Sequence, residues 1–196
     1  MIEVLCAKEL GETAKRRISE IFVEVFGPYL SFFSKDKNKL AEALEHMFVP
    51  DVFHVAVING KIAGMAACTD SNIYPVNHDR DELRKRFGIY KGTLFHVAIK
   101  REFQKPIRAG NRTAVLQFFT TDSKERDQEI AAAMMNYFLA MPQYDNFILE
   151  VADTNTRAIQ LYEQLGFKEF ERIEQKYSRL NGLDCMVYMK YSRCLH

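Results

Sequence analysis

The 196-residue sequence predicts a single domain of mixed α/β class, with a strongly twisted mixed sheet and helices on both of its faces. One observation is the stretch Phe147–Phe167, in which an apolar strand, a capped helix and the start of another strand follow one another directly. A second observation is a pair of hairpin signals, because Asn59-Gly60 and Asn181-Gly182 each separate two strand-like runs.

The N-terminal part of the chain predicts a strand, two amphipathic helices and a hairpin. Their ranges are a strand at 2–7, helices at 12–33 and 37–48, and strands at 52–58 and 62–68. Gly27-Pro28 should bend or end the first helix, because proline removes a backbone donor and disfavours helix in the preceding residue. His54 lies in the hairpin without a carboxylate or nucleophile at a telling spacing, and we interpret it as structural.

A basic segment, Ser71–Arg112, follows the hairpin. It holds ten Lys/Arg against four Asp/Glu, a net charge of +6, whereas the whole chain carries +1. Asp79–Phe87 has acids first and bases last, which suits the dipole of a helix. Thr93–Gln104 alternates in part like a strand, although its length favours a helix. The sequence therefore predicts two helices within this basic segment.

The C-terminal part predicts two helices alternating with strands, and then a hairpin. The ranges are a strand at 113–121, a helix marked by Ile130, Met134 and Phe138 and ended by Pro142, a strand at 147–152, a helix to Leu165, and strands at 170–178 and 184–191. Asp153-Thr154-Asn155 offers N-cap side chains to the second of these helices, and Gly166 offers a left-handed C-terminal residue.

The pattern of Asn155, Ala158, Tyr162, Gly166 and Phe167 resembles the C-terminal motif of the GNAT superfamily, the acetyl-CoA-dependent N-acyltransferases. The resemblance implies that Asn155, Ala158 and their helix flank the pantetheine arm of the coenzyme. It also implies that Tyr162 is the general acid that protonates the departing thiolate. From periodicity alone, Tyr162 is equally compatible with a half-buried core aromatic.

The same resemblance implies a GNAT-like sheet with paired helices beside the acceptor cleft. In this family a short turn usually joins the third and fourth strands, so that residues 71–112 constitute a helical insert. We expect the insert to cover the mouth of the cleft and to help select the acceptor; the alternative is a solvated surface helix pair or a dimer contact. Its cationic side chains, Arg84, Lys85, Arg86, Lys100 and Arg101, would then attract an anionic acceptor or the coenzyme's phosphates.

The family's pyrophosphate-binding loop reads Arg/Gln-x-x-Gly-x-Gly/Ala, and backbone N–H groups at a helix start receive the phosphates. The matching stretch here is Arg126, Asp127, Gln128, Glu129, Ile130 and Ala131. Arg126 and Ala131 fit the pattern, whereas Glu129 replaces a glycine and could crowd the phosphates. Asp127 and Glu129 are also compatible with ordinary acids in the first turn of a helix. Phe119, Thr120 and Thr121 would lend backbone groups to the pantetheine.

The composition of the chain limits the classes of protein to which it can belong. A hydrophobic content of 47% and a charged content of 27% suit a globular protein, and no apolar run approaches the length of a membrane span. The N-terminus lacks the features of a signal peptide, so we expect a cytoplasmic protein with reduced thiols. The four cysteines share no metal-site spacing, and we expect no metal. Near-neutral charge without regular aromatic interleaving argues against nucleic-acid binding.

The leading hypothesis is therefore direct transfer of an acetyl group from acetyl-CoA to a primary amine in a ternary complex. The acceptor is a small-molecule or peptide amine, and a homodimer is left open. The general base is not identified. Glu150 is a candidate that we expect to be buried in an apolar strand, but it could equally pair with a neighbouring base. The alternative is a non-catalytic GNAT-fold module that binds acyl-CoA or serves regulation or dimerisation, and Glu129 is its main support.

Overall fold

The computed structural model describes residues 1–70, 73–103, 109–121, 127–174 and 185–193. Seven strands of this described part form one sheet in the order β1-β2-β3-β4-β5-β7-β6. They are β1 (Ile2–Cys6), β2 (Phe53–Ile58), β3 (Lys61–Thr69), β4 (Thr113–Thr121), β5 (Asn146–Ala152), β6 (Lys168–Glu174) and β7 (Cys185–Ser192). Only β4 and β5 pair in parallel, and the other neighbours are antiparallel. The mixed sheet confirms the predicted fold class.

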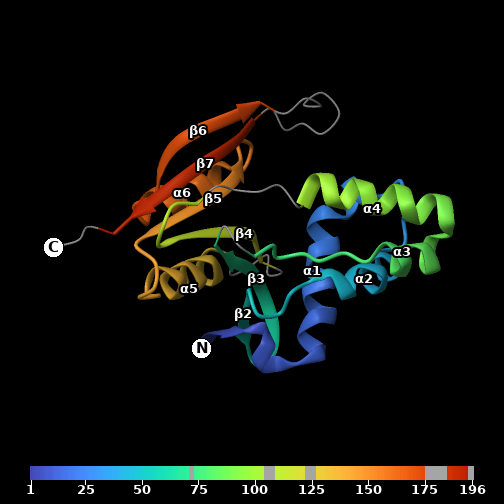
Figure 1. Cartoon of the computed structure of the whole chain (residues 1–196). Coiled ribbons are helices and arrows are strands. Elements are labelled where there is room, and N and C mark those ends of the chain that lie inside the picture. Colours follow the sequence, from blue (N-terminus) through green and yellow to red (C-terminus); the bar gives the residue numbers. More distant parts are fainter. Residues whose placement is uncertain (71–72, 104–108, 122–126, 175–184, 194–196) are drawn as a thin grey trace.

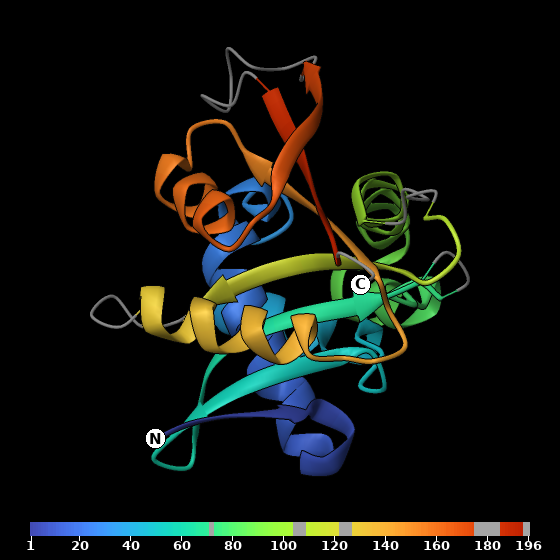
Figure 2. The same ribbon diagram turned by 90° about the vertical axis from the view of Figure 1, so that its left-hand side faces the viewer.

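Helices cover both faces of the sheet, as Figures 1 and 2 show. They are α1 (Glu12–Leu30), α2 (Lys37–Leu44), α3 (Arg80–Phe87), α4 (Ile89–Phe103), α5 (Asp127–Leu139) and α6 (Thr156–Gln164), with short 3₁₀ turns at Ala7–Leu10 and Glu45–Met47. The first four helices pack in one apolar cluster with one face of the sheet, and α5 and α6 pack in a second cluster with the other face.

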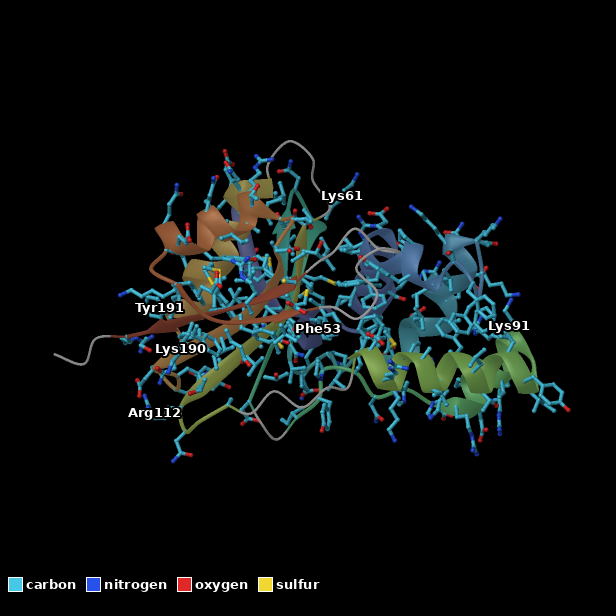
Figure 3. All side chains as sticks on the ribbon, turned by 90° about the horizontal axis from the view of Figure 1, so that it is seen from above. Phe53, Lys61, Lys91, Arg112, Lys190 and Tyr191 are labelled. Atoms are coloured by element: carbon cyan, nitrogen blue, oxygen red, sulfur yellow. The ribbon has the colours of Figure 1, made fainter. Side chains whose placement is uncertain are left out.

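The alternation of side chains along each strand divides the core between these two clusters. In β2, Phe53 and Val55 join the α1 side, whereas Ala56 joins the α5 side. In Figure 3, Phe53 lies in the middle of the molecule, between Lys91 on α4 and Arg112 before β4 at opposite ends. The long axis of the molecule therefore runs from the α3–α4 pair to the β4–β5 end of the sheet.

Several local signals fold as the sequence predicts. Asn59 and Gly60 have φ of 50° and 75°, the left-handed pair that a two-residue hairpin turn requires. The first helix ends at Leu30, three residues earlier than predicted, and it continues through Pro28. The second predicted hairpin turn, Asn181-Gly182, lies outside the described residues.

Two helices, α3 and α4, occupy the segment between β3 and β4. The ambiguous stretch from Thr93 is helical, and α4 begins four residues earlier, at Ile89. Gly92 lets the two helices approach, because a Cβ atom at this position would lie 2.6 Å from the Leu83 carbonyl oxygen and from the Arg84 Cα. The segment is thus a packed helical pair.

Candidate active site

The parallel strands β4 and β5 separate after four paired residues. Their ladder runs from Thr113↔Asn146 to Leu116↔Leu149 and then stops. Beyond that point β4 continues only along β3, and β5 continues only along β7. The edge of β4 that faces β5 over residues 117–120 therefore makes no ladder pairs within the described chain, and its backbone groups can receive a ligand.

A bulge in β4 lies beside this separation. The register against β3 shifts between Met65 and Ala67, and Phe118 adopts a left-handed φ of 54°. As a result, Phe118 points to the α1 side, where its ring contacts Phe22 and other rings. Phe119 points to the α5 side. Regular alternation from Leu116, which joins the α5 and α6 cluster, would place Phe118 on the α5 side, so the bulge reverses which face each of these two neighbouring rings occupies.

Tyr162 lies on α6 beside the separated strands. Its ring centroid is 6.0 Å from that of Phe119 on β4 and 6.0 Å from that of Phe167. The residue is only 5% exposed, and burial raises the pKa of its phenol. The phenol is therefore protonated at neutral pH, as an unshifted phenol would also be.

Capping residues fix the position of α6 and hence of Tyr162. The Asn155 side-chain oxygen accepts a hydrogen bond of 3.2 Å from the backbone N–H of Ala158, as expected for an N-cap. At the other end Gly166 has φ of 93°, and the N–H of Phe167 donates to the Tyr162 carbonyl at 2.9 Å. The local roles predicted for the cap and for Gly166 are confirmed.

The first turn of α5 follows β4 and supplies the expected phosphate-binding position. Gln128 and Glu129 are exposed, Ile130 is fully buried and Ala131 is partly buried. Gly64 on β3 permits this packing, because a Cβ atom there would lie 2.9 Å from Cγ2 of Ile130. Arg126 lies outside the described residues. The exposed side chain of Glu129 leaves the packing of the helix start undisturbed.

Glu150 corrects one expectation from the sequence, because it is exposed and not buried. It is the first residue of β5 after the last pair with β4. Phe147, Leu149 and Val151 join the α5 and α6 cluster, so the alternation directs Glu150 to the opposite face, the face of Phe118. The sequence signal for this orientation was present in the alternation, but the sequence does not show that this face is open.

Tyr188 of β7 is paired with Glu150 in the neighbouring strand. Burial, then the charge of Glu150 and a hydrogen bond with it, raise the pKa of Tyr188. No Lys or Arg in the described part of the chain forms an ion pair with Glu150, so the alternative of pairing with a neighbouring base is not observed. The site thus has a neutral phenol on one face of the sheet and a carboxylate on the other.

The remaining candidates lie elsewhere. His54 is 9% exposed and its ring packs against Tyr137 and Phe138, in agreement with a structural role. An open cavity of about 670 Å³ is lined by His46, His78, His96 and neighbouring polar residues. This cavity adjoins the segment after β3, at the end of that strand away from Gly64 and α5.

Among the described residues, no group of three or more His, Cys, Asp or Glu side chains is placed to hold a metal ion. None of the helices in the described part of the chain is both long enough and apolar enough to cross a membrane.

Comparison with known proteins agrees with this geometry. A model of the acetyltransferase (GNAT) domain matches residues 87–184, half of the chain. The chain belongs to the GNAT acetyltransferase family. No curated protein matches the sequence. The match includes β4, α5, β5 and α6, the elements around the separated strands.

Solved structures of GNAT enzymes share the fold at low sequence identity. An N-acetyltransferase from Staphylococcus aureus Mu50 aligns with a TM-score of 0.66 and 15% identity, over 96% of this chain and 100% of that one. The ribosomal-protein-S18-alanine N-acetyltransferase from Escherichia coli aligns at 0.55 and 15%, over 100% and 96%. The aminoglycoside 6'-N-acetyltransferase from Enterococcus faecium aligns at 0.58 and 14%, over 100% and 98%.

Proposed function

We propose that this GNAT acetyltransferase moves the acetyl group of acetyl-CoA to a primary amine by direct attack in a ternary complex. The observation that carries the proposal is the separation of β4 from β5, with Tyr162 beside it on one face of the sheet and Glu150 on the other. The family provides an acyl-CoA cosubstrate and an amine acceptor. The names of the similar structures include a ribosomal-protein alanine and an aminoglycoside, so they do not select one acceptor.

We assign the coenzyme to the elements around the separated strands. The open edge of β4 fits a pantetheine arm, and the start of α5 fits a pyrophosphate, because helix N-termini present free N–H groups. Asn155 already uses its side-chain oxygen in the cap, which leaves its NH₂ group to donate to the pantetheine. The assigned residues are Phe119, Thr120, Thr121, Arg126, Asp127, Gln128, Glu129, Ile130, Ala131, Asn155 and Ala158.

The chemistry divides between the two faces of the sheet. Acetyl-CoA supplies a thioester. Backbone N–H groups of β4 would polarise the carbonyl of this thioester. Glu150 would hold the acceptor ammonium and take its proton, through a water where distance requires one. As the amine nitrogen bonds to the carbonyl carbon and the C–S bond breaks, Tyr162 would give its proton to the departing sulfur.

The α3–α4 pair would contribute to the acceptor side through its end and not through its charges. Arg84 pairs with Asp81 at 3.5 Å and Arg86 with Glu42 at 3.3 Å, and Lys85 pairs with Glu82. Such exposed, locally compensated pairs produce little field at a distance. The last residue of α4, Phe103, contacts Phe118 at the bulge, with 5.8 Å between the ring centroids.

The test is an acceptor panel with acetyl-CoA, in which thiol release and the acetylated product are both measured. We expect thiol release that depends on the amine, and thermal stabilisation of the protein by acetyl-CoA. Stabilisation without turnover on any amine would instead support the non-catalytic acyl-CoA-binding module. If millimolar acetyl-CoA gave neither stabilisation nor turnover, the proposed coenzyme site itself would be wrong.

A further inference from the structure

Three partly exposed aromatic rings meet where α1, α4 and β4 converge. They belong to Phe26, Phe103 and Phe118, and their centroids are 5.7, 6.0 and 5.8 Å apart in pairs. Phe22 lies beneath them, fully buried, and contacts all three. We call Phe26, Phe103 and Phe118 the aromatic cluster. Its rings retain accessible surface although they adjoin the core.

The backbone conformation at Phe118 indicates that this residue does more than fill the core. A left-handed φ of 54° is rare for a bulky residue and costs free energy that Gly or Asn would avoid. The bulge that imposes it is also what turns the Phe118 ring toward α1, onto Phe26 and Phe103. Strained backbone positions of this kind concentrate at functional sites.

The aromatic cluster adjoins the proposed reaction site. Phe118 is followed directly by Phe119, whose ring contacts the general acid Tyr162. Glu150 lies on the same face of the sheet as Phe118, on the neighbouring strand just past the last β4–β5 pair. Glu150 and the aromatic cluster therefore lie on the same face of the sheet, next to the point where β4 and β5 separate.

The nearby surface of α1 is also apolar. Val25 and Tyr29 are 42% and 54% exposed, and helical spacing puts them on the same side of α1 as Phe22 and Phe26. These side chains are uncharged and would pack against an apolar group of a ligand. Binding of a polycation or a sugar is disfavoured, because its polar atoms would lose water without gaining hydrogen-bond partners.

We propose that the aromatic cluster is the acceptor subsite of this enzyme, and that the acceptor is a primary amine with an aromatic or alkyl substituent on a short linker. This inference rests on the proposed function and adds the chemical class of its acceptor. The ring of such a substituent would pack edge-to-face on Phe103 and Phe118 while the ammonium contacts Glu150.

The first experiment uses the wild-type protein and needs no variant. The kcat/KM for acetylation is measured by thiol release with n-propylamine, n-butylamine, n-pentylamine, 2-phenylethylamine and ethanolamine. Each added methylene that becomes buried should raise kcat/KM by about fourfold. We expect 2-phenylethylamine to exceed ethanolamine by at least about tenfold. Equal values for these two amines, or a preference for ethanolamine, would overturn the proposal.

Variants then locate the subsite. Phe26→Leu and Phe103→Leu keep an apolar side chain but remove the ring, and they should reduce the ratio of kcat/KM for 2-phenylethylamine over n-pentylamine. Phe32→Ala is the matched control, because Phe32 is 70% exposed near the end of α1 and makes no contact with the aromatic cluster. An unchanged ratio in both Leu variants, with folding verified by circular dichroism, would show that the rings only fill the core.

A binding measurement separates this inference from the proposed function. Calorimetry of the wild-type protein with coenzyme A present compares 2-phenylethylamine with ethanolamine, whether or not turnover occurs. Tighter binding of the aromatic amine, weakened in Phe103→Leu, would support the subsite even if no amine were acetylated. Turnover of polar amines without any preference for apolar ones would support the acetyltransferase and overturn the subsite.

Discussion

Tyr162 and Glu150 come from neighbouring elements but act from different surroundings. Tyr162 lies within the α5 and α6 cluster, where burial raises the pKa of its phenol. Glu150 is exposed on the other face, beside Tyr188. The same stretch of chain thus places a buried phenol on one face of the sheet and an exposed acidic side chain on the other.

Replacing Tyr162 by Phe removes the proposed general acid and preserves the ring that packs on Phe119. We expect kcat to fall by about 10²–10⁴-fold, while calorimetry shows unchanged affinity for acetyl-CoA. Because the pKa of the phenol is raised, wild-type kcat should show no loss from ionisation of Tyr162 up to about pH 10. An unchanged kcat in Tyr162→Phe would exclude this residue from the chemistry.

Glu150→Gln keeps the shape of the side chain and removes its charge. We expect kcat/KM to fall at pH 7 and to recover toward the wild-type value as pH rises, because the free amine then no longer needs a base. Glu171→Gln is the control, since Glu171 lies opposite Tyr188 on β6 and is also exposed. A similar loss in both variants would indicate a general charge effect instead of a base at Glu150.

At the scale of elements, the cap of α6 serves both folding and the proposed coenzyme site. Asn155→Ala should reduce the free energy of unfolding by about 0.5–2 kcal/mol, measured with denaturant, because the N–H of Ala158 loses its side-chain acceptor and keeps only the Asn155 carbonyl. Asn155→Asp retains an acceptor and should restore stability. It has no NH₂ donor, however, so acetyl-CoA affinity measured by calorimetry should stay low. Full affinity in Asn155→Asp would refute a contact between the Asn155 amide and the coenzyme.

Histidines lie where α3 and α4 adjoin the turn after α2. His46 Nε2 accepts a 3.0 Å hydrogen bond from the backbone N–H of Asp79, which requires an unprotonated nitrogen. The rings of His78 and His96 lie 4.4 Å apart between centroids. Burial lowers the pKa of His46, and burial, then the charges of His78 and Lys100, lower that of His96.

These shifts predict a loss of stability in mild acid. A folded-state pKa below the unfolded value of about 6.5 means that the unfolded chain binds protons first, so stability is complete above about pH 7 and falls as pH decreases through 6.5. We expect the Tm to fall between pH 7 and pH 5, and to fall less in His46→Gln and His96→Gln. The same slope in both variants would assign the effect to other groups, such as buried His54.

At the scale of the whole molecule, we expect the α3 cations of the segment 71–112 to contribute little at the proposed reaction site, because they lie in local ion pairs. These cations pair with acids of α3 and α2, and Figures 1 and 3 show α3 and the start of α4 at the end of the molecule away from β5 and β7. The part of this segment that approaches the site is Phe103, an apolar ring.

Neutralising Arg84, Lys85 and Arg86 together should therefore leave the ranking of acceptors and its salt dependence unchanged. The measurement is kcat/KM for several amines at two salt concentrations, with Phe103→Leu as the comparison that should alter the ranking. A changed ranking and a flattened salt response in the triple variant would instead support electrostatic selection of an anionic acceptor.

The sequence by itself determined the features that depend on neighbouring residues. The turn at Asn59-Gly60, the cap at Asn155 and the left-handed Gly166 follow from backbone preferences and hydrogen bonds within a few residues. The length of the stretch from Thr93 likewise favoured a helix, since a run of that length is long for a strand, although its apolar residues partly alternate. The order of elements followed from these local signals, and the resemblance to the GNAT motif was a separate observation.

Only the tertiary structure decided which of these residues meet. The bulge at Phe118, the open face beside Glu150 and the contact of Phe103 with Phe118 depend on strand register and on which helix covers which face. The charges of α3 counted as a basic patch in the sequence, but Glu42 of α2 lies 44 residues from Arg86 and neutralises it in space. Such contacts join distant parts of the chain, and their geometry is set by packing of the whole domain, which no local pattern specifies.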